Sequence, residues 1–249
     1  MRGCHRFAAL AATSSLLLMC SSFGTLPADA TTLDGGTDGA IDPIHDDAGP
    51  ADGGADAAPA PCVRLEGLVC VDATEVTNAQ YRRFYESGVV PGAAPGCGGG
   101  APSPGSSLSN GSPDAPVVNV SWCDAASYCA WAGKHLCGAL GDGGAIPRTS
   151  LGDPTQSEWQ RACSDTTSTY ESCNRDSGAP RPVGTAACGS LGISDLIGNV
   201  WEWVDSCDDA ICYFMGGAFT QATAVCGTAS GFARTAVAND VGLRCCAAP

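Results

Sequence analysis

The feature that most constrains this chain is its sixteen cysteines within 249 residues. No two of them form a C-x-x-C pair, the spacing that is typical of zinc ribbons and thioredoxin-type redox sites. A reduced cytosolic protein without metal motifs does not need so many thiols. The cysteines therefore predict a disulfide framework and an oxidising compartment.

The first segment, residues 1–30, predicts an export signal. A short positive region precedes an apolar run at 7–19, which is too short to span a bilayer. Ala28-Asp29-Ala30 fits a signal-peptidase site, whereas Leu17-Leu18-Met19-Cys20 resembles a lipobox that would place a lipid on Cys20. Both interpretations stay open. We expect an exported protein that is secreted, or a lipoprotein of the periplasm or outer surface.

The second segment, residues 31–61, predicts an acidic disordered linker. It carries seven Asp and no Lys or Arg, and Asp, Gly, Ala and Pro dominate it. Such a segment buries too little apolar surface to offset its ordering entropy. The whole chain has a net charge of −14 and no basic cluster, which disfavours nucleic acid and anionic membranes as partners. Membrane attachment is expected only through a lipid on Cys20.

The third segment, residues 62–249, predicts the folded domain and holds fourteen cysteines. Cys62 and Cys70 flank an alternating stretch around Glu66-Gly67, which predicts a hairpin with these two cysteines bridged across it. Long Gly/Pro/Ser loops separate a few short helices. This pattern indicates a loop-rich α+β fold.

Three expected helices begin with one design, in which a hydroxyl N-cap precedes an acidic or amide side chain by three residues. The pairs are Thr77 with Gln80, Ser121 with Asp124, and Thr155 with Glu158. The helices are expected to end at about Gly88, Gly133 and Cys163. Cys207 and Cys212 lie close enough in the chain to bridge a local loop.

Several motifs, in order, resemble the formylglycine-generating-enzyme (sulfatase-modifying factor) family. They are Glu75-Val-Thr-Asn78 with Tyr81 and Phe84, Pro116-Val-Val-Asn-Val-Ser-Trp-Cys-Asp-Ala125 with Tyr128-Cys-Ala-Trp131, Gly133-Lys134-His135-Leu136 with Thr155-Gln-Ser-Glu-Trp159, Asp195-Leu-Ile-Gly-Asn-Val-Trp-Glu-Trp203, Met215-Gly-Gly-Ala-Phe219 and Gly242-Leu-Arg-Cys245. The resemblance covers nearly all of 62–249. It implies a C-type-lectin-like α+β fold with little regular secondary structure, and a disulfide between Cys129 and Cys245.

The founding activity of that family converts a sulfatase cysteine to formylglycine with O2 and copper(I), which two cysteines five residues apart bind. Counted from the Gly216-Gly217 motif, these positions fall on Gln221 and Cys226, and the pocket serine and histidine fall on Ala218 and Ala222. Trp203 retains the pocket tryptophan. Copper is therefore not expected. Cys226 is either a lone metal ligand or nucleophile, or part of a structural disulfide, for instance with Cys163.

Other catalytic classes have little support in the sequence. His135 is the single histidine within 62–249, so a site with two or three histidine ligands is excluded there. His135 also occupies a structural arginine position of the family. A nucleophile–histidine pair would depend on it alone.

The resemblance also implies a calcium site at the Gly-Asn-Val-Trp-Glu-Trp turn. The implied ligands are the carbonyls of Ile197, Gly198 and Val200 and the side chain of Glu202. The alternative is that Asn199 and Glu202 brace a buried turn.

Two classes of function remain after these comparisons of residues. In the first, the domain is a non-catalytic binding or scaffold module with an extracellular protein or glycan as its ligand, contacted through loops 91–115 and 164–190. In the second, it is a metal-dependent oxidoreductase that oxidises protein cysteines by means of Cys226. The missing cysteine, serine and histidine favour the first class.

Overall fold

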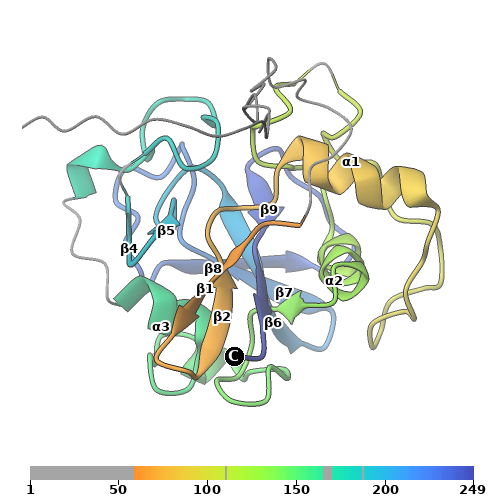
Figure 1. Ribbon diagram of the computed structural model, residues 1–249, viewed down its shortest axis with the longest axis horizontal. Helices are drawn as coiled ribbons and strands as arrows, with labels where there is room; N and C mark the ends of the chain where they lie inside the picture. Colours follow the sequence, from red (N-terminus) through yellow and green to blue (C-terminus); the bar gives the residue numbers. More distant parts are fainter. Residues whose placement is uncertain (1–58, 110, 165–169, 187) are drawn as a thin grey trace, which may run out of the picture. The chain divides into compact units, whose positions relative to one another are not determined.

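The computed structural model describes residues 59–249 apart from 110, 165–169 and 187. The predicted export signal and most of the predicted linker lie outside the described residues. The described chain is an α+β fold, as expected, with two four-stranded sheets, one two-stranded sheet and three α-helices (Figure 1). No helix within the described ranges is long and apolar enough to cross a membrane.

The helical elements are α1 (Asn78–Ser87), α2 (Trp122–Trp131), α3 (Glu158–Ser164) and the 3-10 turns η1 (Arg148–Ser150) and η2 (Tyr170–Ser172). The strands are β1 (Cys62–Leu65), β2 (Val69–Asp72), β3 (His135–Leu136), β4 (Gly189–Ser190), β5 (Ile193–Ser194), β6 (Trp201–Asp208), β7 (Ile211–Met215), β8 (Ala229–Ala233), β9 (Val241–Leu243) and β10 (Cys245–Ala247). Most elements are short, because glycine- and proline-rich loops interrupt the chain.

The first sheet has the order β1-β2-β10-β3, and all its neighbours are antiparallel. β1 and β2 form the hairpin that the sequence predicts, with Cys62 bonded to Cys70. Glu66 and Gly67 both have positive φ, at 47° and 70°, which suits a tight hairpin turn.

The second sheet has the order β8-β7-β6-β9, in which β6 and β9 run parallel and the other pairs are antiparallel. Only Arg244 separates β9 from β10, so the chain leaves one sheet and enters the other across a single residue. Arg244 therefore lies where the two sheets meet.

The first two helices begin as predicted, with complete capping boxes from Thr77 and Ser121. Gly88 ends α1 with φ of 64°, and α2 ends two residues before the predicted Gly133. The third prediction is wrong by two positions. The Thr155 hydroxyl donates to Asp153 in a preceding turn, and the Ser157 hydroxyl accepts the backbone N–H of Gln160 instead.

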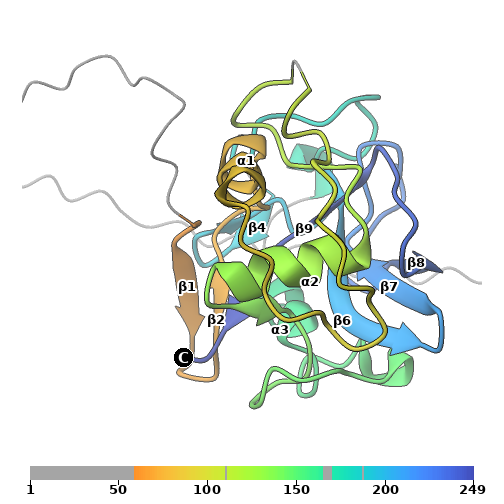
Figure 2. The same cartoon turned by 90° about the vertical axis from the view of Figure 1, so that its right-hand side faces the viewer.

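The core consists of two clusters of buried side chains. One cluster surrounds Trp159 and Met215, beside α3, and the other surrounds Trp203 and Phe214, beside α1 and α2. Figure 2 shows α2 running from beside β2 of the first sheet towards β6 of the second. Tyr81 and Phe84 of α1 are buried there, and Tyr81 stacks on Tyr128 with 5.6 Å between ring centroids.

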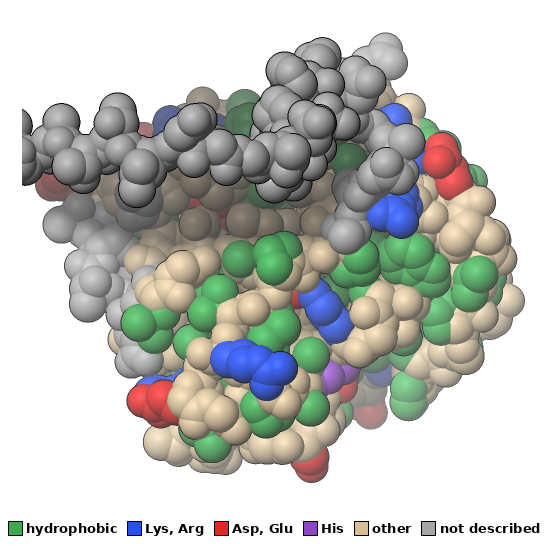
Figure 3. Space-filling model, in the orientation of Figure 1, with side chains coloured by type: hydrophobic (Ala, Val, Ile, Leu, Met, Phe, Trp, Pro, Cys, Tyr) green, Lys and Arg blue, Asp and Glu red, His purple; other side chains and the backbone are tan. Residues whose placement is uncertain are grey.

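Seven disulfides join all fourteen cysteines of the domain. The three expected pairs, Cys62–Cys70, Cys129–Cys245 and Cys207–Cys212, are present. The other four are Cys97–Cys123, Cys137–Cys246, Cys163–Cys226 and Cys173–Cys188. This framework fits a protein exported to an oxidising compartment. On the face seen in Figure 3, Lys and Arg side chains are scattered, in keeping with the lack of basic clusters in the sequence.

Candidate functional site

The residues at the family's copper and pocket positions offer no pair of free thiolates in this structure. Cys226 is bonded to Cys163 of α3, so neither sulfur is a thiolate. Ala218 is buried in the core, and Ala222 is exposed. Gln221 lies in a short turn in which its backbone N–H donates to the carbonyl of Ala218. Copper(I) needs soft thiolate ligands, and this set supplies none while the disulfide is formed.

Trp203, the retained pocket tryptophan, lies in the core at 1% exposure. Its indole N–H donates to the carbonyl of Val120 over 3.0 Å, and its ring meets Phe214 edge-on with centroids 5.0 Å apart. The structure therefore gives Trp203 the contacts of a packing residue that joins β6 to the segment before α2.

The Gly-Asn-Val-Trp-Glu-Trp turn brings Asn199 to a buried network. Asn199 has φ of 56°, a region that Asn adopts more readily than most residues. Its amide donates to Glu75 over 2.9 Å, and its side-chain oxygen accepts from Asn174 and from the backbone N–H of Arg181. Asn199 thus braces this turn against three other segments.

Glu202 binds a cationic side chain of the protein itself. Its carboxylate accepts three hydrogen bonds from the guanidinium of Arg244, at 2.9 to 3.2 Å, and one from the Trp159 indole N–H at 2.7 Å. Glu202 and Arg244 are 1% and 0% exposed. Both carboxylate oxygens are thus occupied.

The implied calcium ligands do not fit calcium well in this arrangement. Calcium takes six to eight oxygen ligands, usually with carboxylates that are free to turn toward the ion. The one carboxylate of the set, Glu202, already faces a guanidinium. Ile197 and Val200 are buried, and the Gly198 N–H donates to the carbonyl of Gly216.

Two further acids lie near Arg244. Glu75 is fully buried; one of its oxygens accepts from Asn199, and the other has no hydrogen-bond partner among the described residues. Burial raises the pKa of Glu75 well above its ordinary range, and the neighbouring carboxylate of Asp195 adds to this rise. Burial likewise raises the pKa of Asp195 to about 6. Two opposing effects lower this pKa: the hydrogen bond that the carboxylate accepts from the Gly184 N–H, and the charge of Arg244. Arg244 therefore balances more than one buried acid.

One group of potential metal-binding side chains occurs among the described residues, at Cys137, Glu158 and Cys246. Its two cysteines are bonded to each other, which removes both thiolates. The Glu158 carboxylate binds His135 Nε2 at 3.0 Å and the backbone N–H of Gly138 at 2.8 Å. His135 therefore fills a structural position, as the motif comparison indicates.

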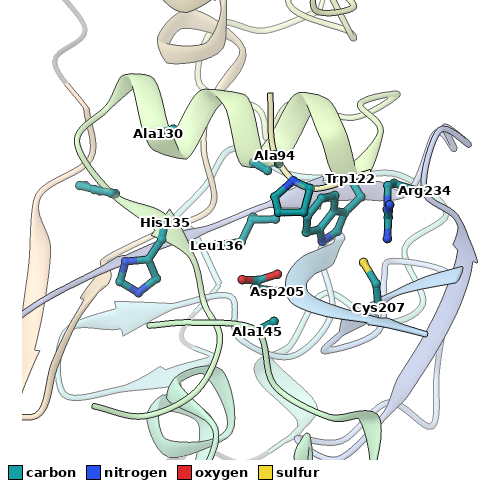
Figure 4. Close-up of a pocket in the computed structure, with 12 residues that line it drawn as sticks. Ala94, Trp122, Ala130, His135, Leu136, Ala145, Asp205, Cys207 and Arg234 are labelled. Carbon is teal, nitrogen blue, oxygen red and sulfur yellow. The ribbon is translucent and has the colours of Figure 1, made fainter. Parts of the chain in front are cut away.

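Sequence reasoning missed a cavity of about 450 Å³ between α2, β3 and the C-terminal half of β6 (Figure 4). We call it the α2–β6 cavity; its lining includes Ala94, Trp122, Leu136, Asp205, Cys207 and Arg234. Figure 4 shows the Asp205 carboxylate directed into this space, below Leu136 and Trp122. No single sequence motif marks the cavity, because its residues come from five separate segments.

The fold and these sites define a disulfide-stabilised α+β domain that is held together by a buried Glu–Arg centre. A sequence model of the Sulfatase-modifying factor enzyme 1-like domain matches residues 36–249. The chain belongs to this family.

Curated relatives match shorter stretches. A hercynine oxygenase from Mycobacterium tuberculosis is 30% identical over 111 residues, which cover 37% of this chain and 22% of that protein. A formylglycine-generating enzyme from Thermomonospora curvata is 33% identical over 138 residues, which cover 45% and 40%. The matched stretches thus span less than half the length of either relative.

Two solved structures are similar to this chain at low sequence identity. CarF is 24% identical with a TM-score of 0.49, and the match covers 73% of this chain and 86% of CarF. PvdO from Pseudomonas aeruginosa is 18% identical with a TM-score of 0.49, and the match covers 72% of this chain and 79% of PvdO.

Proposed function

We propose that this domain is an exported, non-catalytic binding or scaffold module of its family. The observation that carries the proposal is the bond between Cys163 and Cys226. It occupies the one cysteine that remains of the copper-binding pair, and the other position holds Gln221. A sulfur within a disulfide is neither a thiolate nucleophile nor a copper(I) ligand.

The setting supports a role outside the cell. Seven disulfides rigidify the domain and fit an oxidising compartment. The acidic segment 31–61 would serve as a spacer, anchored through a lipid on Cys20 or released after cleavage at Ala30. A rigid frame with long loops presents a contact surface to a protein, a glycan or a smaller ligand.

The test begins with the redox state of Cys226. The purified protein is alkylated without reduction, digested and analysed by mass spectrometry, with the Cys207–Cys212 pair as an internal reference for a bridged state. We expect a peptide in which Cys226 is linked to Cys163. The same preparation, loaded with copper(I) and given O2 and a CxPxR-type peptide, should form no formylglycine.

A matched variant distinguishes two reasons for inactivity, a cysteine blocked by its disulfide and a copper site that lacks a second thiolate. Cys163→Ser frees Cys226, and we expect it to remain inactive because the second thiolate is still missing. Formylglycine production by the natural chain would overturn the proposal and favour a metal-dependent oxidoreductase that uses Cys226.

A further inference from the structure

We propose that the α2–β6 cavity binds a small organic ammonium ion, with its charged group at Asp205 and its apolar body against Trp122 and the alanines of α2. This inference deepens the proposed binding function and rests on it. The cavity volume of about 450 Å³ lies within the range of small-ligand sites. The ligand class follows from the charge and the walls of the cavity.

The charge argument begins with Asp205. Its backbone is held by β6, where its N–H donates to Cys137 and its carbonyl accepts from Ile146. Its carboxylate, in contrast, has no hydrogen bond or ion pair with any described residue, although the side chain is half-buried. A carboxylate removed from much of its water and left unpaired favours a cationic partner.

The other charged groups that line the cavity already have partners. Lys134 forms an ion pair with Asp72 of β2, and His135 binds Glu158 of α3 at 3.0 Å. Neither pair is directed to Asp205, so the Asp205 carboxylate has no ion-pair partner among the described residues.

Arg234 also lines the cavity and lies next to Trp122 (Figure 4). Its guanidinium lies 5.5 Å from the Trp122 ring centre and donates to the carbonyl of Asp209 over 2.8 Å. Gly96 allows this placement, because a Cβ there would overlap the guanidinium. Arg234 thus covers part of Trp122 and leaves the carboxylate of Asp205 free.

The walls favour a ligand with an apolar body. Ala94, Ala126, Ala130 and Leu136 supply aliphatic surface, and Trp122 supplies an indole whose N–H is used by the carbonyl of Val204. One carboxylate among such neighbours cannot supply the six to eight oxygens that calcium takes. An ammonium group needs a single strong acceptor and tolerates an apolar remainder.

The cavity is also preorganised. The Cys97–Cys123 disulfide ties the 94–97 turn to the start of α2, and Cys207–Cys212 closes the end of the β6–β7 hairpin. Little ordering is then needed when a ligand enters, which favours affinity in a small site.

The pH dependence follows from the groups around Asp205. Burial raises the pKa of Asp205 above its ordinary value of 3.8, while His135 lowers it and Glu158 raises it. Lys134 and Arg234 are the other charged residues of the lining. Ammonium binding should therefore be at full strength at neutral pH and weaken as acidification protonates Asp205.

The experiment measures binding of 2-phenylethylamine to the oxidised protein by calorimetry at pH 7. The neutral 2-phenylethanol and the anionic 3-phenylpropanoate have similar bodies and serve as matched ligands. We expect the amine to bind at least about tenfold more tightly than either. N-acetyl-lysine methylamide, measured alongside, distinguishes a free amine from the side chain of a protein partner.

Two variants locate the site. Asp205→Asn should weaken amine binding by about 10- to 100-fold and leave the alcohol unaffected, since it removes a charge-assisted contact. Asp176→Asn, an exposed acid outside the cavity, is the control for the charge change. Ala126→Leu should weaken the amine and the alcohol alike by filling the cavity, with only a small loss of helix propensity.

Three results would overturn the inference. They are equal binding of the three phenyl ligands, no amine binding up to 10 mM (roughly the millimolar limit of weak affinity), and an unchanged amine affinity in Asp205→Asn. If Asp205→Asn does not fold, the pH profile of the natural chain decides, because affinity that does not fall on acidification contradicts a role for Asp205. Peptide oxidation is a separate readout, so failure of the proposed function remains distinguishable from failure of this inference.

Discussion

Replacing Arg244 by methionine tests the buried centre most directly. Arg244 is 0% exposed and donates five hydrogen bonds: three to the Glu202 carboxylate, one to the carbonyl of Asp72 and one to the carbonyl of Ser194. Methionine has a comparable length but no charge and no donor. Arg244→Met therefore leaves Glu202 buried without its cation.

The expected loss of unfolding free energy is about 3–5 kcal/mol, the range for a buried ion pair deprived of one partner. Arg244 also lowers the pKa values of Glu75 and Asp195, so its removal makes both buried acids harder to ionise. A loss of this size is a large fraction of the stability of a typical domain.

Urea unfolding under non-reducing conditions, followed by tryptophan fluorescence, gives the free energies. Glu202→Gln retains an acceptor for the Trp159 N–H, so the double variant with Arg244→Met should be more stable than the sum of the single losses by about 2 kcal/mol or more. Glu66→Gln, which breaks the exposed pair with Arg161, should change stability by less than about 1 kcal/mol. Strict additivity, or a loss below about 1 kcal/mol for Arg244→Met, would refute the compensating role of Arg244.

Three further outcomes are expected. The folded state holds a proton on Asp195 between its ordinary pKa of 3.8 and about 6, so stability should fall as pH rises through this window. Asp195→Asn should remove about 1–3 kcal/mol of that fall, measured by urea titrations at pH 4 and pH 7. The same fall in the natural chain and in the variant would contradict this expectation. Calcium in millimolar excess over EDTA should shift the melting temperature by less than about 1 °C, whereas occupancy of a tight site would raise it by several degrees. Paired Cys→Ala substitution of Cys163 and Cys226, 63 residues apart, should destabilise the protein by about 2 kcal/mol more than the same change at Cys207 and Cys212, five residues apart; equal urea midpoints would argue against the longer cross-link.

Local sequence patterns predict the parts of the fold that depend on neighbouring residues. The hairpin around Glu66-Gly67 and the capping boxes of Thr77 and Ser121 are present because a turn or a cap needs only a few adjacent side chains. The same rule placed the third cap at Thr155. There, Asp153 competes for the hydroxyl, and Ser157 caps the helix.

The long-range contacts could not be derived in this way. The partners of Arg244 lie 42 to 172 residues away in the chain, and Asn199 binds Glu75 across 124 residues. The family motifs mark Glu202 as buried and polar but do not say that its cation is an arginine. The α2–β6 cavity left no pattern, because the space depends on how five segments pack.

The position of β10 has a consequence for synthesis. β10 lies inside the first sheet, between β2 and β3, and Cys245 and Cys246 cross-link to residues 116 and 109 positions earlier. β2 and β3 have no strand between them until residues 245–247 have been made and have reached the sheet. During that interval Cys129 and Cys137 have not met their native partners and can form disulfides with other cysteines. Correct oxidation thus depends on a late event, and a thiol–disulfide isomerase that undoes premature pairs should raise the yield of native protein more than a faster oxidant.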